Sequence, residues 1–262
     1  MTDYRLVQVD AFADRPFAGN PAAVMPLDAW LPDETLQAIA EENNLSETAF
    51  TVPLGGEEAD YELRWFTPTT EVALCGHATL ASGHVLMERD EIRFRTCKAG
   101  VLAVRRLDEG YALDLPVTLV REQPHPELLE VLGTPTASVH LSYAGAEATA
   151  IVLLEDEAAV RACKPDMKRL AGIELMVIVT APGRETDVVS RVFVPAWGVD
   201  EDPVTGSAHA ALAPFWAERL GRPAFSAFQA SRRGGRVECR HSGDRAILGG
   251  GCVTVIEGMM RL

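Results

Sequence analysis

Hydrophobic and polar residues alternate along many short stretches of this chain, which is the pattern of half-buried β-strands. Residues 5–12 are an example, because Val7, Val9 and Ala11 share one face of an extended segment. Similar stretches predict further strands at residues 48–52, 61–66, 92–97, 101–107, 111–115, 139–143, 149–154, 175–181, 188–194, 225–230, 236–240 and 252–257. The chain is therefore expected to be rich in short strands.

Apolar residues at helical spacing predict fewer helices. Residues 33–42 and 156–163 show this spacing, and residues 118–133 indicate a linker with a short helix. Residues 76–87 and 207–219 consist mostly of small and apolar residues, so these two helices are expected to be buried on most sides.

The two halves of the chain follow the same order of elements. Phe66-Thr67-Pro68 precedes Gly76, as Phe193-Val194-Pro195 precedes Gly206, and the two glycines lie 130 positions apart. This spacing is longer than the period of solenoid repeats, so we interpret it as a duplicated half-domain. The predicted fold is α+β, with each half wrapping a curved, mostly antiparallel sheet around one buried helix.

Pro116 marks the expected boundary between the halves. The first half-domain is predicted to cover residues 1–116, with the last strand at about 252–262 as a candidate addition. The second is predicted to cover residues 117–251.

Composition narrows the classes of function. The 262 residues are 47% hydrophobic and carry a formal net charge of −14, with a sequence pI near 4.9. Such a charge repels nucleic acids and anionic membranes, so neither is an expected partner. The basic segment Arg232–Arg236 is interpreted as a solvated loop. The sequence has neither an apolar run of about 20 residues nor a signal-peptide pattern, so the chain is expected in the cytoplasm. Its five cysteines are widely scattered and are expected to be reduced thiols.

The starts of the two apolar helices are the predicted binding site. Helix N-termini carry unpaired N–H groups and a partial positive charge, and Gly76 and Gly206 would let a ligand approach the backbone. If both ends point into a cleft between the halves, they would bind the carboxylate of a small-molecule substrate. The alternative is that both glycines only permit tight turns.

Polar residues beside these glycines favour the functional interpretation. His77 could share a proton or act as a packing residue, and Asp202 could handle a proton or cap its helix. Thr205 and Ser207 are either caps or substrate donors. Glu47 stands at the entry of an apolar strand, where burial would raise its pKa and suit it to general acid–base work; alternatively it is a solvent-facing edge residue.

A metal site is not expected. His77 and His84 lie seven residues apart, and His209 or Cys75 could be imagined as a further ligand, but the sequence contains no His-Glu-x-x-His pattern and no tight cluster of histidine and cysteine. It also contains no dinucleotide-binding or Walker pattern, so no cofactor is predicted.

Several motifs together resemble the PhzF-like phenazine-biosynthesis family. They are Asp10-Ala-Phe, Gly19-Asn-Pro21, Ser46-Glu-Thr48, Phe66-Thr-Pro68, Cys75-Gly-His-Ala-Thr79 and Glu201-Asp-Pro-Val-Thr-Gly-Ser-Ala208. The resemblance spans most of the chain, and its last motif is the most specific. It implies a diaminopimelate-epimerase-like fold, a homodimer and a reaction without a cofactor.

The resemblance also implies roles for single residues. In the phenazine enzyme a glutamate takes a proton from C3 of dihydro-3-hydroxyanthranilate and returns it at C1, and by motif this role falls on Glu47. His77, Asp202 and Ser207 match other polar site positions of the family. Gly76 and Gly206 match its carboxylate-binding helix starts. We also assign Asn20, Cys75 and Thr205 to the substrate site.

One position departs from the phenazine enzyme. Cys75 stands where that enzyme typically has alanine, and related amino-acid racemases and epimerases use cysteine there together with a second, opposing thiol. The opposing position here is Thr205, whose hydroxyl is too weak an acid and base, so a two-thiol racemase is disfavoured. Three hypotheses stay open: an acid–base isomerase centred on Glu47, a racemase or epimerase assisted by Cys75, and a metabolite-binding protein without turnover.

Overall fold

The computed structural model describes residues 1–144 and 148–262 and divides the chain into two compact units. Unit 1 contains residues 1–115 and 249–262, and unit 2 contains residues 116–248. The last strand therefore lies in the first unit, although it is the most distant part of the sequence. None of the described helices is both long and apolar enough to cross a membrane.

Unit 1 is built on strands that alternate between antiparallel hairpins and parallel crossovers. Its elements are β1 (Asp3–Ala11), β2 (Asn20–Pro26), α1 (Asp33–Asn43), β3 (Glu47–Pro53), β4 (Tyr61–Phe66), β5 (Glu71–Val72), α2 (Gly76–Leu86), β6 (Glu91–Thr96), β7 (Val101–Arg106), β8 (Tyr111–Pro116) and β18 (Cys252–Arg261). β1 pairs with β18 and β2, and the parallel pairs β2/β3 and β4/β6 are connected through α1 and α2.

Unit 2 repeats this plan. Its elements are β9 (Arg121–Glu122), α3 (Pro126–Leu132), β10 (Ser138–Ser142), β11 (Thr149–Leu153), α4 (Glu157–Ala162), α5 (Met167–Leu170), β12 (Met176–Pro182), β13 (Val188–Val194), the 3-10 helix η1 (Pro195–Trp197), β14 (Val199–Asp202), α6 (Gly206–Leu220), β15 (Ala224–Gln229), β16 (Gly235–Ser242) and β17 (Arg245–Gly250). The parallel pairs are β11/β12 and β13/β15, and α6 connects the second pair as α2 does in unit 1.

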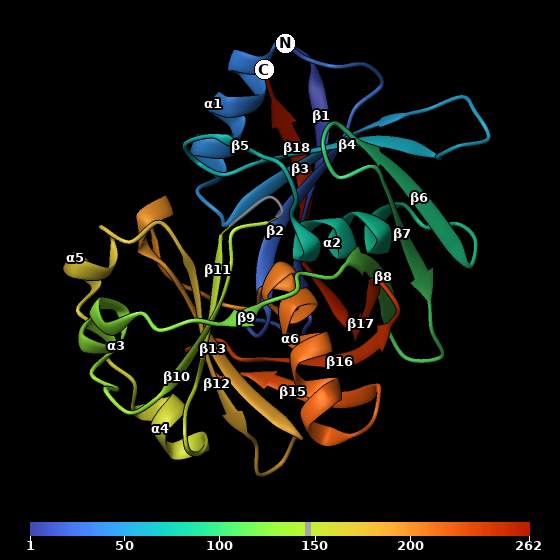
Figure 1. Ribbon diagram of the computed structural model, residues 1–262. Helices are drawn as coiled ribbons and strands as arrows, with labels where there is room; N and C mark the ends of the chain where they lie inside the picture. Colours follow the sequence, from blue (N-terminus) through green and yellow to red (C-terminus); the bar gives the residue numbers. More distant parts are fainter. Residues whose placement is uncertain (145–147) are drawn as a thin grey trace. The chain divides into compact units, whose positions relative to one another are not determined.

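The helices of unit 1 cover two sides of its sheet. Leu36 and Ile39 of α1 pack with Met25 and Phe50 of the strands in one apolar cluster. α2 lies against β1, β2, β3 and β7 (Figure 1). Its residues from Gly76 to Gly83 are all buried. A helix enclosed in this way must have small apolar residues all round, which explains the composition of this stretch.

Several strands and one short helix were not predicted. Residues 20–26 form strand β2, although Gly19, Asn20 and Pro21 are residue types that favour a turn. The prediction also lacks strands β14 and β17, the two-residue strands β5 and β9, and the four-residue helix α5. Turn-forming residues such as Pro21 show where a turn ends, but they do not show that a paired strand begins there. The two helices at residues 76–87 and 207–219 were confirmed, with bounds that differ by one residue at each changed end.

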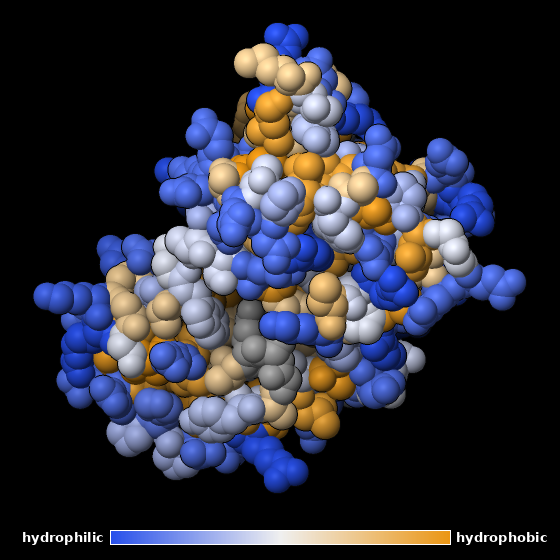
Figure 2. All heavy atoms as spheres, turned by 90° about the horizontal axis from the view of Figure 1, so that it is seen from above, coloured by the Kyte–Doolittle hydropathy of each residue, from blue (hydrophilic) through white to orange (hydrophobic). Residues whose placement is uncertain are grey.

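Most acidic and basic residues of the described ranges are at least partly exposed at the surface. On the face drawn in Figure 2, hydrophilic residues are interspersed with smaller hydrophobic areas. None of the five cysteines, all of which lie in the described ranges, forms a disulfide.

Candidate active site

Glu47 and His77 form a close pair in unit 1. Glu47 is the first residue of β3, and His77 lies in the first turn of α2, which packs against that strand. Glu47 Oε2 lies 3.0 Å from His77 Nε2, and the two side chains are 17% and 5% exposed. The alternative interpretation of Glu47 as a solvent-facing edge residue is therefore wrong. The structure places this carboxylate beside a buried imidazole ring.

The opposite ring nitrogen of His77 has its own contacts. Asn20, the buried first residue of β2, places Nδ2 3.2 Å from His77 Nδ1, and Ser46 Oγ donates to Asn20 Oδ1 at 3.0 Å. Because the amide nitrogen can only donate, it makes Nδ1 the acceptor of a neutral ring and puts the ring proton on Nε2. That proton faces Glu47. The missed strand β2 thus fixes the orientation and tautomer of His77.

Cys75 completes this group. Its Sγ lies 3.5 Å from His77 Nδ1, and its side chain is buried. Cys75 is also the N-cap residue of α2, which begins at Gly76, and its side chain makes no capping hydrogen bond. Unit 1 therefore brings together Glu47, His77, Asn20, Cys75 and Gly76, five of the nine residues that the sequence assigned to the site.

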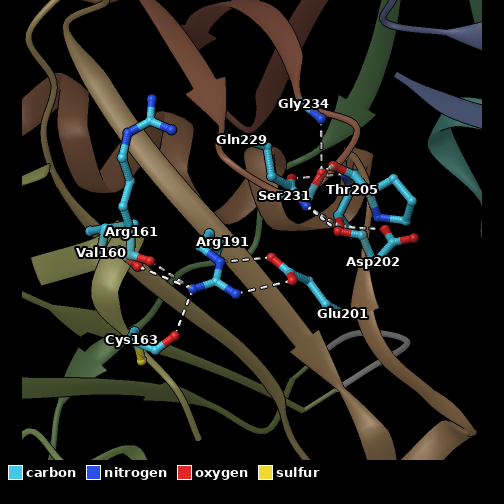
Figure 3. A network of polar contacts seen from close by, with 11 residues as sticks. Val160, Arg161, Cys163, Arg191, Glu201, Asp202, Thr205, Gln229, Ser231 and Gly234 are labelled. Carbon is cyan, nitrogen blue, oxygen red and sulfur yellow. Dashed lines mark hydrogen bonds and ion pairs between the residues drawn. The ribbon is translucent and has the colours of Figure 1, made fainter. Parts of the chain in front are cut away.

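The other four assigned residues lie together at the start of α6 in unit 2. Asp202 ends β14, and its Oδ2 accepts a hydrogen bond from Thr205 Oγ1 (Figure 3). Thr205 is the N-cap of α6 and, contrary to one expectation, its side chain does not cap the helix. Gly206 is the first residue of the helix, and Ser207 Oγ contacts Met176 Sδ at 3.6 Å.

Sequence reasoning missed Gln229, which organises this helix start. Its fully buried amide accepts a hydrogen bond from Thr205 N at 2.9 Å and donates to the Asp202 carbonyl at 2.7 Å and to Thr205 Oγ1 at 3.2 Å (Figure 3). One side chain thus satisfies several polar groups of the turn between β14 and α6. A single glutamine at the end of a strand gives no signal in the sequence.

His209, one turn into α6, is held in the neutral state. It is fully buried, and its Nδ1 lies 2.7 Å from the Thr205 carbonyl, so that nitrogen carries the ring proton. Burial lowers the pKa of His209 to about 4. At neutral pH it is a structural hydrogen-bond donor.

Glu201, inside the most specific motif, has a structural partner. Arg191 on β13 binds it through two contacts, Nε to Oε1 at 2.7 Å and one terminal nitrogen to Oε2 at 3.0 Å (Figure 3). The other terminal nitrogen donates to the Cys163 carbonyl at 2.6 Å. The hydrogen bonds to Glu201 raise the pKa of Arg191. This fork fixes β14, and with it Asp202, against β13.

The third histidine considered for a metal site lies elsewhere. His84 contacts Tyr111 through Nδ1 at 3.0 Å and Thr254 through Nε2 at 2.9 Å. Burial is the main cause that lowers the pKa of His84, with a smaller contribution from Arg106.

Solved structures place the whole architecture in a known class. The fold resembles that of a hydroxyproline epimerase from Agrobacterium vitis, with a TM-score of 0.61 and 14% identity. The match covers 98% of this chain and 92% of the other. A phenazine biosynthesis protein of the PhzF family from Enterococcus faecalis matches much better, with a TM-score of 0.92 and 43% identity over 100% of both chains. The fold is thus the epimerase-like α+β fold predicted from the sequence.

Sequence comparison narrows the class to a family. Residues 9–258 match the family PhzC-PhzF, described as phenazine biosynthesis-like protein. An uncharacterized isomerase of Pseudomonas aeruginosa is 51% identical over 262 residues, which is 97% of each chain. The chain belongs to the phenazine biosynthesis-like family, and these relationships support an isomerase-type enzyme.

Proposed function

We propose that the protein is an isomerase that moves a proton between two carbon atoms of a small carboxylate, with Glu47 as the acid and base. Glu47 would remove a proton from one carbon while the electron pair passes into the conjugated system of the substrate. It would then return the proton to another carbon, so the molecular formula does not change. The observation that supports this is the 3.0 Å contact between Glu47 and a buried His77 whose far side is fixed by Asn20.

His77 has a positioning and electrostatic part in this proposal. His77 Nε2 lies 3.0 Å from Glu47 Oε2, so the ring can position this carboxylate beside the substrate. The N–H on Nε2 would also stabilise the negative charge that develops on a substrate bound beside Glu47. The N–H groups at Gly76 would bind the substrate carboxylate. Asp202, Thr205, Gly206 and Ser207 enter the proposal through the family motif that they form.

A second function is favoured by one contact. Cys75 Sγ lies 3.5 Å from His77 Nδ1, so the ring could accept the thiol proton and generate a thiolate. A Cys75-assisted racemase or epimerase is therefore the alternative. Thr205 at the position of the expected second thiol disfavours it.

Isotope exchange from heavy water separates the two. We expect the wild-type protein to introduce deuterium into one member of a panel of dihydroaromatic carboxylic acids, amino acids and hydroxyproline. Glu47→Gln should reduce uptake by about 100-fold or more, because the amide cannot exchange the proton. Glu109→Gln, at an exposed site, is the matched control.

Unchanged uptake in Glu47→Gln would show that the proposal is wrong. If Cys75→Ala abolishes exchange while Glu47→Gln retains it, the racemase alternative holds. Binding of an acid from the panel without exchange by the wild-type protein would indicate a metabolite-binding protein.

The proposal includes three properties that the family resemblance implies or the sequence predicts. The reaction should need no added cofactor, the protein should act in the cytoplasm, and it should form a homodimer. Light scattering should then give a mass twice the 28.4 kDa of one chain. Dialysis against a chelator should leave exchange intact.

A further inference from the structure

Among the described residues, Glu47, Cys75 and His77 form a group of three metal-binding side chains. One carboxylate oxygen, the thiol sulfur and one ring nitrogen all lie within 4.8 Å of one another. Tetrahedral zinc sites hold their ligands at about 2.0–2.3 Å from the ion, which puts the ligand atoms roughly 3.3–3.8 Å apart. The observed group is therefore close to the required geometry before any side chain moves.

We propose that these three side chains bind a borderline-soft divalent cation of the Zn²⁺ class, with a fourth coordination position left to solvent. The donor set argues for this class, because thiolate and imidazole ligands select zinc-like ions over Mg²⁺ or Ca²⁺. Three protein ligands and an open fourth position are a common zinc arrangement. Neither the sequence prediction nor the family motif includes such a site.

Charge and hydrogen bonding support the same inference. Glu47 Oε2 is buried, and its contact with His77 is close but not aligned as a hydrogen bond, so the described residues give this oxygen no hydrogen-bond donor. A bound cation would satisfy it. A thiolate and a carboxylate together carry two negative charges, which one divalent ion neutralises in a buried place.

Binding must release one proton from this group. The Cys75 thiol loses its proton to solvent and becomes the ligand, Glu47 binds as a carboxylate, and neutral His77 binds through a ring lone pair. Apparent affinity should therefore rise about tenfold per pH unit as long as the thiol is protonated in the metal-free protein. One consequence rests on the proposed function. Because Glu47 and His77 cannot take part in proton transfer while they bind the cation, the cation would act as an inhibitor.

Titration of the untagged, reduced protein with Co²⁺ tests the site without any substrate. We expect one equivalent to bind and to produce a thiolate-to-cobalt charge-transfer band in the near ultraviolet, because cobalt takes tetrahedral zinc sites and reports a sulfur ligand. Zn²⁺ should displace it in competition with a chromophoric chelator. Cys75→Ser should abolish the band and weaken Zn²⁺ binding by more than the roughly 10–100-fold that loss of an outer contact costs.

Cys97→Ser is the matched control, because Cys97 is exposed and lies outside the group. It should keep the band and the affinity. Glu47→Gln should keep the band but bind more weakly, which provides a second test if Cys75→Ser does not fold by circular dichroism. A wild-type protein without the band, or a folded Cys75→Ser that retains it, would overturn the proposal. The cobalt titration uses no substrate, so its outcome does not depend on the isotope-exchange experiment. Failure of the metal-site proposal can therefore be told apart from failure of the proposed function.

Discussion

Two of the buried histidines, His77 and His209, have different polar neighbours. His77 faces a carboxylate on one nitrogen and an amide donor on the other, so the neutral ring with its proton on Nε2 finds a suitable neighbour at both nitrogens. His209 has a carbonyl on Nδ1 and apolar surroundings, which suit only the neutral ring. The two imidazoles occupy corresponding helices of the two units, yet His77 lies beside a carboxylate whereas His209 bonds to a carbonyl.

The low pKa of His209 should make stability depend on pH. Burial lowers the folded-state pKa to about 4, against about 6.5 in an unfolded chain. Between these values the unfolded state binds the extra proton, so the free energy of unfolding falls as pH drops from 6.5 towards 4. The full effect of this one group is about 3 kcal/mol. Urea titrations at pH 7.5, 5.5 and 4.5 would measure it.

His209→Gln is the comparison for that measurement, because its amide keeps a donor but does not titrate. Its urea stability should lose less on going from pH 7.5 to 4.5 than that of the wild-type protein. A histidine ring resonance assigned to His209 that shifts with a midpoint near 6.5 would contradict the expected burial effect.

Helix α2 both contributes residues to the candidate site and packs tightly against the sheet. Its first residues, Gly76 and His77, belong to the candidate site, and its later residues press against the sheet. A Cβ atom on Gly83 would lie 2.6 Å from Val104 Cγ1 and 2.9 Å from Val104 Cβ on strand β7. Valine is stiff about χ1, so it cannot turn away from this contact. Gly83 therefore sets how closely α2 approaches β7.

Gly83→Ala should destabilise the protein, although alanine is the better helix former. Overpacking costs about 1–3 kcal/mol in a tight core, against a gain of about 1 kcal/mol from helix propensity. Urea unfolding of both single variants and of Gly83→Ala/Val104→Ala forms a double-mutant cycle. The double variant should be more stable than the sum of the single effects by about 1 kcal/mol or more. Strict additivity would show that the two residues do not compete for space.

The sequence predicted the elements that periodicity can reveal. The small-residue composition of α2 and α6 indicated both buried helices, and alternation indicated β1 with Val7 and Val9 facing the core. β14 was missed because a strand of four residues, three of them acidic, takes its stability from pairing with its neighbour rather than from its own pattern.

The site could be predicted only as far as its motifs reach. Glu47 and His77 were named from family motifs, and the structure brings them together within unit 1. Gln229 and Ser46 act through hydrogen bonds across distant segments, which no local pattern encodes. The grouping of Cys75 with Glu47 and His77 likewise depends on how α2 packs against β3.

At the scale of the whole molecule, the chain ends in the unit where it begins. β18 pairs with β1 along nearly its full length, from Asp3 opposite Arg261 to Ala11 opposite Cys252. Thr2 and Leu262 exchange backbone hydrogen bonds of 2.8 and 3.1 Å, so the two termini lie side by side (Figure 1). Unit 1 is therefore complete only after β18 has been synthesised.

This closure predicts that a circular permutant will fold and that a shortened chain will not. Joining residue 262 to residue 1 by a short Gly/Ser linker and opening the exposed connection between Gly55 and Gly56 keeps every pair of β1 with β18. Ending the chain at Leu248 instead removes β18 and exposes backbone groups of β1 and the core beneath them. Circular dichroism and urea unfolding should show a cooperative permutant close to wild type in stability, and loss of the cooperative transition of unit 1 in the shortened chain. A shortened chain that retains full stability would mean that β18 is a dispensable edge strand, and that the fold of unit 1 is held by residues 1–115 alone.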